Sequence, residues 1–335
     1  MHDSSVIDWL LEEENPSVRY FTQIELLGMD KHHPDVVESR HRIMSQGIVP
    51  TILAKQNPDG SWGDAACFYT DKYSGTSWTL LTLAQLGVDI EDPRIKKACE
   101  FMLNASQDPL DGGFSIETSQ KTGRGLPRLV IPCLTGNMVY ALVRLGYLHD
   151  DRIRHAIRWI LTHQRTDDGV KETPKGALDD RLSPCFGDHS CHMGVAKAMK
   201  ALAAIPKQER NEETSAKIGE LAEYFLIHRL YKKSHDLDRV AKPGWLKFGF
   251  PLMYQTDVVE LLEILIDLGI RDDRMNEALT LLKSKQNEDG KWILENSYNG
   301  KMIVDIEEKG KPSKWITFKA MKVIKKYRES DLTSA

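Results

Sequence analysis

The sequence predicts an all-α chain built from repeated helix hairpins. Segments of similar pattern start at Leu86, Leu145 and Leu268, and each begins with a Leu-Gly pair that ends one helix. Each segment then places apolar residues at helical spacing and ends in a loop that contains Asp-Gly. One such hairpin cannot bury its apolar faces alone, so neighbouring hairpins must stack against one another.

A glutamine closes the second helix of each repeat. These residues are Gln56, Gln107, Gln164 and Gln286, which are 51, 57 and 122 residues apart. Because the last step is close to two periods, we expect one further hairpin with a diverged loop, beginning with the helix EYFLIHRLYKKSH. Its basic stretch, residues 228–239, either gathers an anion or complements the helix dipole at a C-terminus.

Acidic pairs precede the second helices. Asp-Asp-Arg begins at residues 150, 179 and 272, where carboxylates are expected to cap the helix and to suit the positive end of its dipole. Helix capping is enough to explain these acidic pairs, so we do not expect them to bind a diphosphate.

Composition and charge exclude several function classes. The 335 residues carry a formal net charge of -4, which leaves no basic footprint for nucleic acid. No apolar run reaches the ~18 residues that a membrane span needs, and the N-terminus lacks the features of a signal peptide. Five cysteines are an odd number, which favours reduced thiols. We therefore expect a cytoplasmic protein with no transmembrane segment.

Residues 1–48 differ in pattern from the repeats. The segment NPSVRYFTQIELLGMD has the form of a HEAT-type helical repeat, with a proline in the first turn. No flexible linker follows it. We expect residues 1–48 to be a helical cap in the same domain as the repeats of residues 49–335.

The Gln to Asp-Gly-aromatic loops resemble the QW-type repeats of squalene-hopene cyclases and of protein prenyltransferase β subunits, over about residues 50 to 327. More narrowly, PCLTG, HSCH and FGFPLMYQTD resemble the prenyltransferase/squalene oxidase repeat proteins of bacteria and archaea. The resemblance implies an α/α toroid of about five to six hairpins, with alternating inner and outer helices. It also implies that Trp62, Phe114 and Trp292 pack against the preceding glutamines.

Two cyclase signatures are missing from the sequence. Neither the Asp-x-Asp-Asp motif, whose middle acid protonates an alkene in class II cyclases, nor the class I Asp-Asp-x-x-Asp motif occurs in it. Polyene cyclisation is therefore not the activity that we expect.

In a toroid of this kind, equivalent positions of the inner helices form a ring. We count back from the helix ends at Gly87, Gly146 and Gly269, with Ala203 in place of the missing glycine. This places the following residues at one level: Ser74 or Gly75, Cys133, Cys191 and Asp257, with His192 next to Cys191, and His189 and Tyr254 one helical turn earlier.

These residue types are those of a zinc site. Zinc binds thiolate, imidazole and carboxylate ligands, so we expect Cys133, Cys191, His192 and Asp257 as ligands. Helix N-termini are expected to lower the thiol pKa values. The combination resembles the zinc site of protein prenyltransferases, and the adjacent Cys-His resembles that of lanthionine cyclases. Asp188, His189 and Tyr254 are the expected catalytic residues.

Two other interpretations of the cluster stay open. Without a metal, Cys191 or Cys133 is a nucleophile with a histidine as its base. Alternatively, the cysteines are ordinary core residues, as we expect for Cys67 and Cys99. Cys185 lies in the loop SPCFGDHSC and is either a ligand or a residue of the cavity rim.

The expected function is that of a zinc-dependent transferase, cyclase or lyase acting on an isoprenoid or on a thiol or peptide substrate. The alternative is a non-catalytic toroid that binds a ligand or peptide, because stacked helical repeats make extended recognition surfaces.

Overall fold

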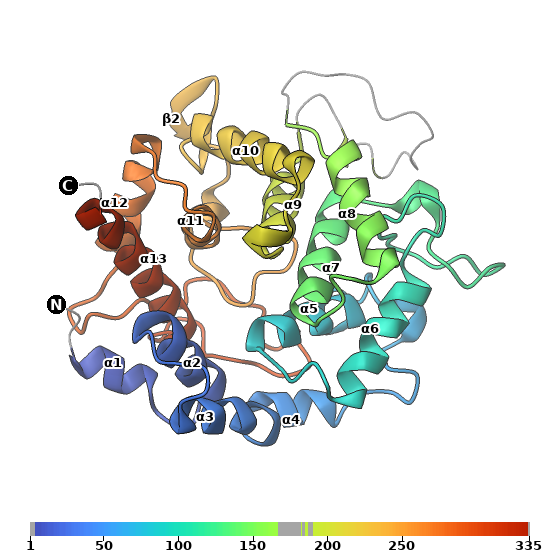
Figure 1. Cartoon of the computed structure of the whole chain (residues 1–335), viewed down its shortest axis with the longest axis horizontal. Helices are drawn as coiled ribbons and strands as arrows, with labels where there is room; N and C mark the ends of the chain where they lie inside the picture. Colours follow the sequence, from blue (N-terminus) through green and yellow to red (C-terminus); the bar gives the residue numbers. More distant parts are fainter. Residues whose placement is uncertain (1–3, 167–181, 183–184, 187–189, 334–335) are drawn as a thin grey trace. The chain divides into compact units, whose positions relative to one another are not determined.

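The computed structural model describes residues 4–166, 182, 185–186 and 190–333, and most of them are helical (Figure 1). The chain forms two compact units. Unit 1 comprises Met1–Ala54, Phe225–Leu252 and Thr256–Ala335, and unit 2 comprises Lys55–Tyr224 and Met253–Gln255. The predicted division into a cap of residues 1–48 and repeats of residues 49–335 stays a prediction.

Unit 2 contains the hairpins. Its helices are α5 (Thr76–Leu86), α6 (Pro93–Ala105), α7 (Pro132–Arg144), α8 (Asp151–His163), α9 (His192–Ala203) and most of α10 (Glu212–Ile227). Every residue of α5 is buried, and α7 and α9 are buried over most of their length, whereas α6 and α8 each bury one face. In Figure 1, α5, α7 and α9 lie side by side, with α6 and α8 outside them. The all-α class with inner and outer helices of an α/α toroid is confirmed.

The predicted helix caps are confirmed. Asp150 and Asp272 each accept the backbone N–H of the arginine two residues later, at 2.8 Å, and Asp92 does the same in the first repeat. In each case the arginine side chain also pairs with the capping carboxylate. The third predicted cap, at residues 179–181, lies outside the described residues.

The repeat glutamines brace their loops. Gln56, Gln107 and Gln286 donate through Nε2 to the carbonyl of the Asp-Gly glycine, at 3.1, 3.0 and 2.9 Å. In unit 2, the same amide of Gln56 and Gln107 also reaches a carbonyl in the first turn of the next outer helix, that of Arg94 or Arg152. The glutamine thus joins consecutive hairpins.

The aromatic residue after each loop is fully buried. Trp62, Phe114 and Trp292 are at most 1% exposed. The backbone N–H of each donates to a threonine hydroxyl in the first turn of an inner helix, and these acceptors are Thr76, Thr135 and Thr317, at 2.9 to 3.0 Å. This repeated bond fixes the loop against the inner helix.

Unit 1 holds both ends of the chain. Its elements are α1 (Ser4–Leu10), α2 (Pro16–Phe21), a π-helix (Thr22–Leu26), α3 (Pro34–Ser45), α4 (Ile48–Leu53), β1 (Lys232–Lys233), β2 (Asp236–Val240), α11 (Val258–Asp267), α12 (Asn276–Ser284) and α13 (Lys314–Thr333). Helix α13 packs on α11 and on the N-terminal helices. The Trp315 ring stacks on Phe250 with centroids 4.3 Å apart.

The diverged loop of the predicted extra hairpin is a small antiparallel β-hairpin. Helix α10 ends at Ile227, so the basic stretch of residues 228–239 turns back as β1 and β2 instead of extending the helix. Arg229 and Leu230 have positive φ angles of 46° and 69°, which makes the sharp exit from the helix. Lys232 pairs with Glu277 and Arg239 lies 4.0 Å from Asp236, so these two cations have partners within the protein.

No helix among the described residues combines the length and the apolar character needed to cross a membrane.

Candidate active site at the inner-helix N-termini

The inner helices start where the repeat register predicts. Gly75, Cys191 and Asp257 are the N-cap residues of α5, α9 and α11, and Cys133 is the second residue of α7. Helix α9 ends at Ala203, the residue taken in place of the missing glycine. Cys133, Cys191, His192 and Tyr254 belong to unit 2, whereas Asp257 belongs to unit 1. Asp188 and His189 lie outside the described residues.

Three of the five cysteines interact within unit 2. Cys133 is buried; burial raises the pKa of its thiol, and neighbouring Cys191 and Cys185 raise it further, whereas the charge of Lys197 opposes the shift. Burial also raises the pKa of the Cys185 thiol to about 11, again with a contribution from Cys191. Cys185, left open on sequence grounds, therefore belongs to the cluster. We call Cys133, Cys185 and Cys191 the thiol cluster.

The predicted lowering of the thiol pKa at the helix N-termini is wrong for Cys133, because loss of water around its buried sulfur disfavours the anion by more than the start of α7 favours it. Burial has the same effect on the pKa of Cys185, which lies in a loop. Both thiols are therefore held in the protonated form near neutral pH. Cys191 is the member of the thiol cluster that combines partial exposure with the N-cap position of a helix of 12 residues.

Aromatic residues of unit 2 border the thiol cluster. The Trp78 ring lies between Tyr69 and Tyr254, with centroid separations of 5.2 and 5.9 Å. Burial and a hydrogen bond with Tyr73 raise the pKa of Tyr254 to about 12. Tyr254 is therefore a proton donor at neutral pH, not a base.

The His192 ring is oriented by Tyr224. Its Nδ1 lies 3.4 Å from the Tyr224 hydroxyl, which itself donates to the Ser190 carbonyl at 3.3 Å. With the phenol proton directed at Ser190, the tautomer of neutral His192 that carries its proton on Nδ1 can donate to Tyr224. In that tautomer the other ring nitrogen, Nε2, is unprotonated, which is the form that a general base requires.

A small polar cavity adjoins two of the thiols. It has a volume of about 10 Å³ and is lined by Pro132, His163, Gln164, Arg165, Cys185, Phe186, Ser190 and Cys191. Gln164 is 4% exposed, and no described residue offers its Oε1 a hydrogen bond. A Cβ atom on Gly194 would lie 2.9 Å from Cβ of Pro132 and 3.3 Å from this Oε1. The glycine thus lets the start of α9 approach both residues.

The zinc ligands expected from the sequence, Cys133, Cys191, His192 and Asp257, stay a prediction. No group of three or more His, Cys, Asp or Glu side chains in that part is placed to hold a metal ion. Asp257 accepts two backbone N–H groups at 2.9 Å, from Glu260 on Oδ1 and from Gly249 on Oδ2, and it caps α11. The structure therefore does not support the four-ligand set, and zinc binding stays a prediction.

Two buried polar residues near the site were not predicted. Lys197 is fully buried on α9, and its backbone lies against Gly136 of α7, where an added Cβ would come within 2.5 Å. Asn137 is fully buried on α7 and donates to the Met253 carbonyl at 3.0 Å. The sequence feature that could have indicated these two residues is a polar residue inside an otherwise apolar run, as in MGVAKAMKALAA.

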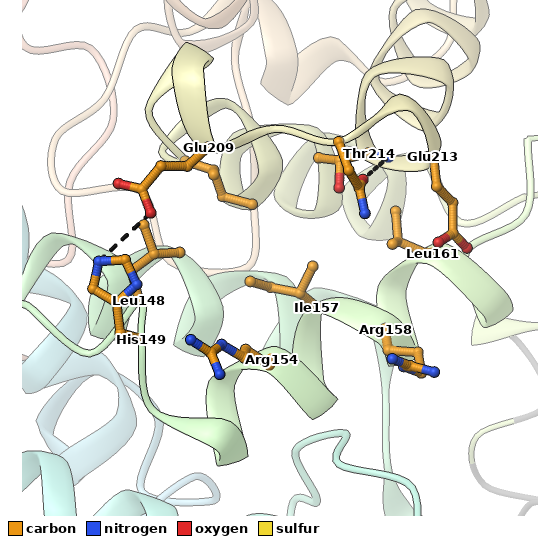
Figure 2. Close-up of a pocket in the computed structure, with 11 residues that line it drawn as sticks. Leu148, His149, Arg154, Ile157, Arg158, Leu161, Glu209, Glu213 and Thr214 are labelled. Atoms are coloured by element: carbon orange, nitrogen blue, oxygen red, sulfur yellow. Dashed lines mark hydrogen bonds and ion pairs between the residues drawn. The ribbon is translucent and has the colours of Figure 1, made fainter.

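A wider groove of about 360 Å³, the outer groove, lies along outer helix α8 in unit 2 (Figure 2). Ile157 and Leu161 of α8 form part of its floor, with Leu148 and Ile205. Arg154 and Arg158 of α8 line one wall, and Glu209 and Glu213 line the other. His149 bridges to Glu209 at 3.5 Å and joins the two walls at one end.

No family model matches the sequence, and no curated protein matches it. The backbone is similar to that of a protein from Actinoplanes, with 15% identity over 97% of this chain and 99% of that chain and a TM-score of 0.46. It is also similar to a glycosyl hydrolase of family 88 from Bacteroides vulgatus, with 12% identity over 97% of each chain and a TM-score of 0.49. A type II terpene cyclase from Scytonema has 14% identity over 95% of this chain and 88% of that chain, with a TM-score of 0.43. Such low identities and TM-scores carry no conclusion about activity. The narrower resemblance to the prenyltransferase/squalene oxidase repeat proteins stays a prediction.

Proposed function

We propose that unit 2 is an enzyme module that transfers an alkyl or acyl group through the thiol of Cys191. The observation that carries the proposal is the thiol cluster itself, which gathers three of the five cysteines at the starts of inner helices α7 and α9. Of its members, Cys191 is the one that is partly exposed and caps a helix, so it is the thiol that a substrate can reach.

The neighbouring groups have matching roles in this proposal. The unprotonated Nε2 of His192 is the candidate base, because Tyr224 holds its Nδ1 proton. Tyr254 retains its proton and is the candidate donor to a leaving group. The buried ring of Trp78 and the half-buried ring of Tyr69 suit an apolar substrate such as an isoprenoid, and a thiol or peptide is the corresponding acceptor. No step in this scheme uses a metal.

The test is the alkylation rate of Cys191 by iodoacetamide between pH 6 and 9. If His192 assists the thiol, His192→Gln should slow alkylation about tenfold at pH 7 and little at pH 9, because hydroxide then removes the proton. His155→Gln, which changes an exposed histidine of α8 that does not line the small cavity, is the matched control and should leave the profile unchanged. Equal pH profiles for the wild type and His192→Gln would show that His192 does not act as the base for Cys191.

Zinc is tested separately. Elemental analysis of untagged protein beside a Cys191→Ala/His192→Ala variant should give about one zinc per chain, lost in the variant, if the metal prediction holds. A metal content that is the same in both proteins would contradict it.

The outer groove favours a second candidate function, the binding of a peptide segment. Arg158 and Glu213 stand on opposite walls, and neither has an ion-pair partner among the described residues. An amphipathic helix with an acidic row, an apolar stripe and a basic row would complement both walls and the floor. A synthetic peptide of that pattern should bind the wild type, and Arg158→Glu should weaken its binding about tenfold. Equal affinity for the two proteins would exclude this mode.

A further inference from the structure

The small cavity beside Cys191 has features that the proposed transfer reaction does not use. Cys185 and Cys191 both line it, although they come from a loop and from the N-cap of α9. Its volume of about 10 Å³ corresponds to roughly one water molecule. The site can therefore take up a single additional oxygen atom but no large ligand.

Gln164 gives this cavity a specific polar character. Its side chain is 96% buried, its Nε2 donates to the Arg165 carbonyl at 2.7 Å, and its Oε1 finds no donor among the described residues. An unsatisfied buried acceptor is costly, so the position suits a small group with an O–H donor. Its approach to Gly194, the third residue of α9, places this acceptor at the same helix start that Cys191 caps.

We propose that Cys191 and Cys185 form a thiol-oxidation site, in which hydrogen peroxide converts Cys191 to a sulfenic acid and Cys185 resolves it to a disulfide. In the first step the Cys191 thiolate attacks one peroxide oxygen, the O–O bond breaks, and the leaving hydroxide takes up a proton to become water. The sulfur is oxidised by two electrons and the peroxide is reduced. The new S–O–H group occupies the cavity and donates its hydrogen bond to Oε1 of Gln164.

In the second step the Cys185 sulfur attacks the sulfur of the sulfenic acid. The S–S bond forms, the S–O bond breaks, and the hydroxyl leaves as water with the proton of the Cys185 thiol. Formation of the disulfide does not depend on the transfer reaction proposed above. The effect of the disulfide on activity does rest on that proposal: the oxidised protein loses its nucleophile, and a dithiol reductant restores it.

The experiment treats the reduced, full-length protein with a small excess of hydrogen peroxide. Remaining thiols are then blocked under denaturing conditions, and the peptides are mapped by mass spectrometry. We expect one disulfide, Cys185 to Cys191, with Cys67, Cys99 and Cys133 still blocked as thiols. A bridge from Cys133 to Cys191, or oxidation of Cys191 without any bridge, would overturn the assignment of Cys185.

Matched variants separate the two steps. In Cys185→Ser, the sulfenic acid at Cys191 should persist and be labelled by dimedone, whereas Cys67→Ser should behave as the wild type. Gln164→Leu should shorten the lifetime of that sulfenic acid several-fold in the Cys185→Ser background. Equal lifetimes would contradict the role of Gln164.

The outcome is distinguishable from that of the transfer proposal. If Cys191 of the reduced protein reacts rapidly with iodoacetamide but peroxide gives no disulfide, the proposed oxidation site is wrong and the proposed nucleophile is not affected. If the disulfide forms but Cys191 is alkylated no faster than Cys67, the proposed nucleophile is wrong and the oxidation site is not affected.

Discussion

At the scale of single residues, burial dominates the acid-base properties of this protein. Asp257 is 1% exposed, and burial raises the pKa of its carboxyl group to about 7, although two backbone N–H groups stabilise the anion. Asp272 performs the same capping role at the surface, where Arg274 lowers the pKa of its carboxyl group to about 2. The two caps differ in exposure and in their charged neighbours, not in residue type.

This difference gives a pH-dependent prediction for Asp257→Asn. A carboxyl group whose pKa is raised from ~3.9 in the unfolded chain to about 7 contributes stability below pH ~4, and this contribution is lost as the pH rises through 7. We expect the stability of the wild type relative to the variant to fall by about 2 kcal/mol between pH 5 and pH 8. Urea denaturation at both pH values measures it.

Asp272→Asn is the control, because its carboxyl titrates below this range and the corresponding difference should not change. A pH-independent difference for Asp257→Asn would show that burial does not control this cap.

Prediction from sequence was uneven at this scale. Cys133 and Cys191 were recognised as neighbours because both sit near the starts of repeated helices, and the repeat fixes that position. The sequence leaves open whether Cys185 belongs to the thiol cluster, because the position of this residue depends on how an irregular loop folds. Nor did the pattern indicate that water is excluded from Cys133, which reverses the expected shift of its pKa.

At the scale of the elements, the repeat glutamines are expected to contribute unequally. Gln107 is 2% exposed and joins Gly112 to Arg152, whereas Gln56 makes the equivalent bonds near the surface. Gln107→Ala should cost about 2 kcal/mol, because the buried Gly112 carbonyl and the partly buried Arg152 carbonyl lose their donor. Gln56→Ala should cost less than 1 kcal/mol, since water replaces the amide there. Thermal denaturation of the two variants makes the comparison; equal losses would be evidence against it.

Helices α11 and α13 are held together by a partly buried ionic network. Lys322 is 7% exposed, with its Nζ 2.8 Å from Asp267, 3.4 Å from Glu263 and 3.7 Å from Glu25. These carboxylates outweigh desolvation and raise the pKa of Lys322, so it stays charged.

We expect Lys322→Met to destabilise the protein by about 3 kcal/mol, because the carboxylates lose their shared cation. Lys325→Met is the matched control on the same helix; Lys325 donates to the Leu26 carbonyl at 3.0 Å and is 25% exposed, so about 1 kcal/mol is expected. Chemical denaturation gives both values. A loss no larger than that of the control would mean that the network contributes little.

The elements predicted best are those defined by local chemistry. Aspartate caps, Leu-Gly endings and buried aromatics after Asp-Gly each depend on a few adjacent residues, and they were confirmed where the structure describes them. The β-hairpin of β1 and β2 was not predicted, because the exit from α10 uses left-handed Arg229 and Leu230 where sequence rules expect glycine.

At the scale of the whole molecule, unit 1 depends on both ends of the chain. Lys314 of α13 pairs with Glu12 at 2.7 Å, and Lys326 pairs with Glu25 at 3.0 Å. Removal of residues 314–335 should therefore make the N-terminal helices sensitive to trypsin, while residues 55–160 stay protected. Limited proteolysis with mass spectrometry of the fragments tests this, and continued protection of residues 1–54 would contradict it.

In the proposed function, Cys191 is the most reactive of the five thiols of the chain. The most direct measurement is competitive alkylation of the reduced, folded protein with limiting iodoacetamide at pH 7, followed by mapping of all five cysteines. We expect Cys191 to be modified about tenfold faster than Cys67, which is also partly exposed but lies outside the thiol cluster. Equal rates for Cys67 and Cys191, or faster reaction of Cys133, would contradict it.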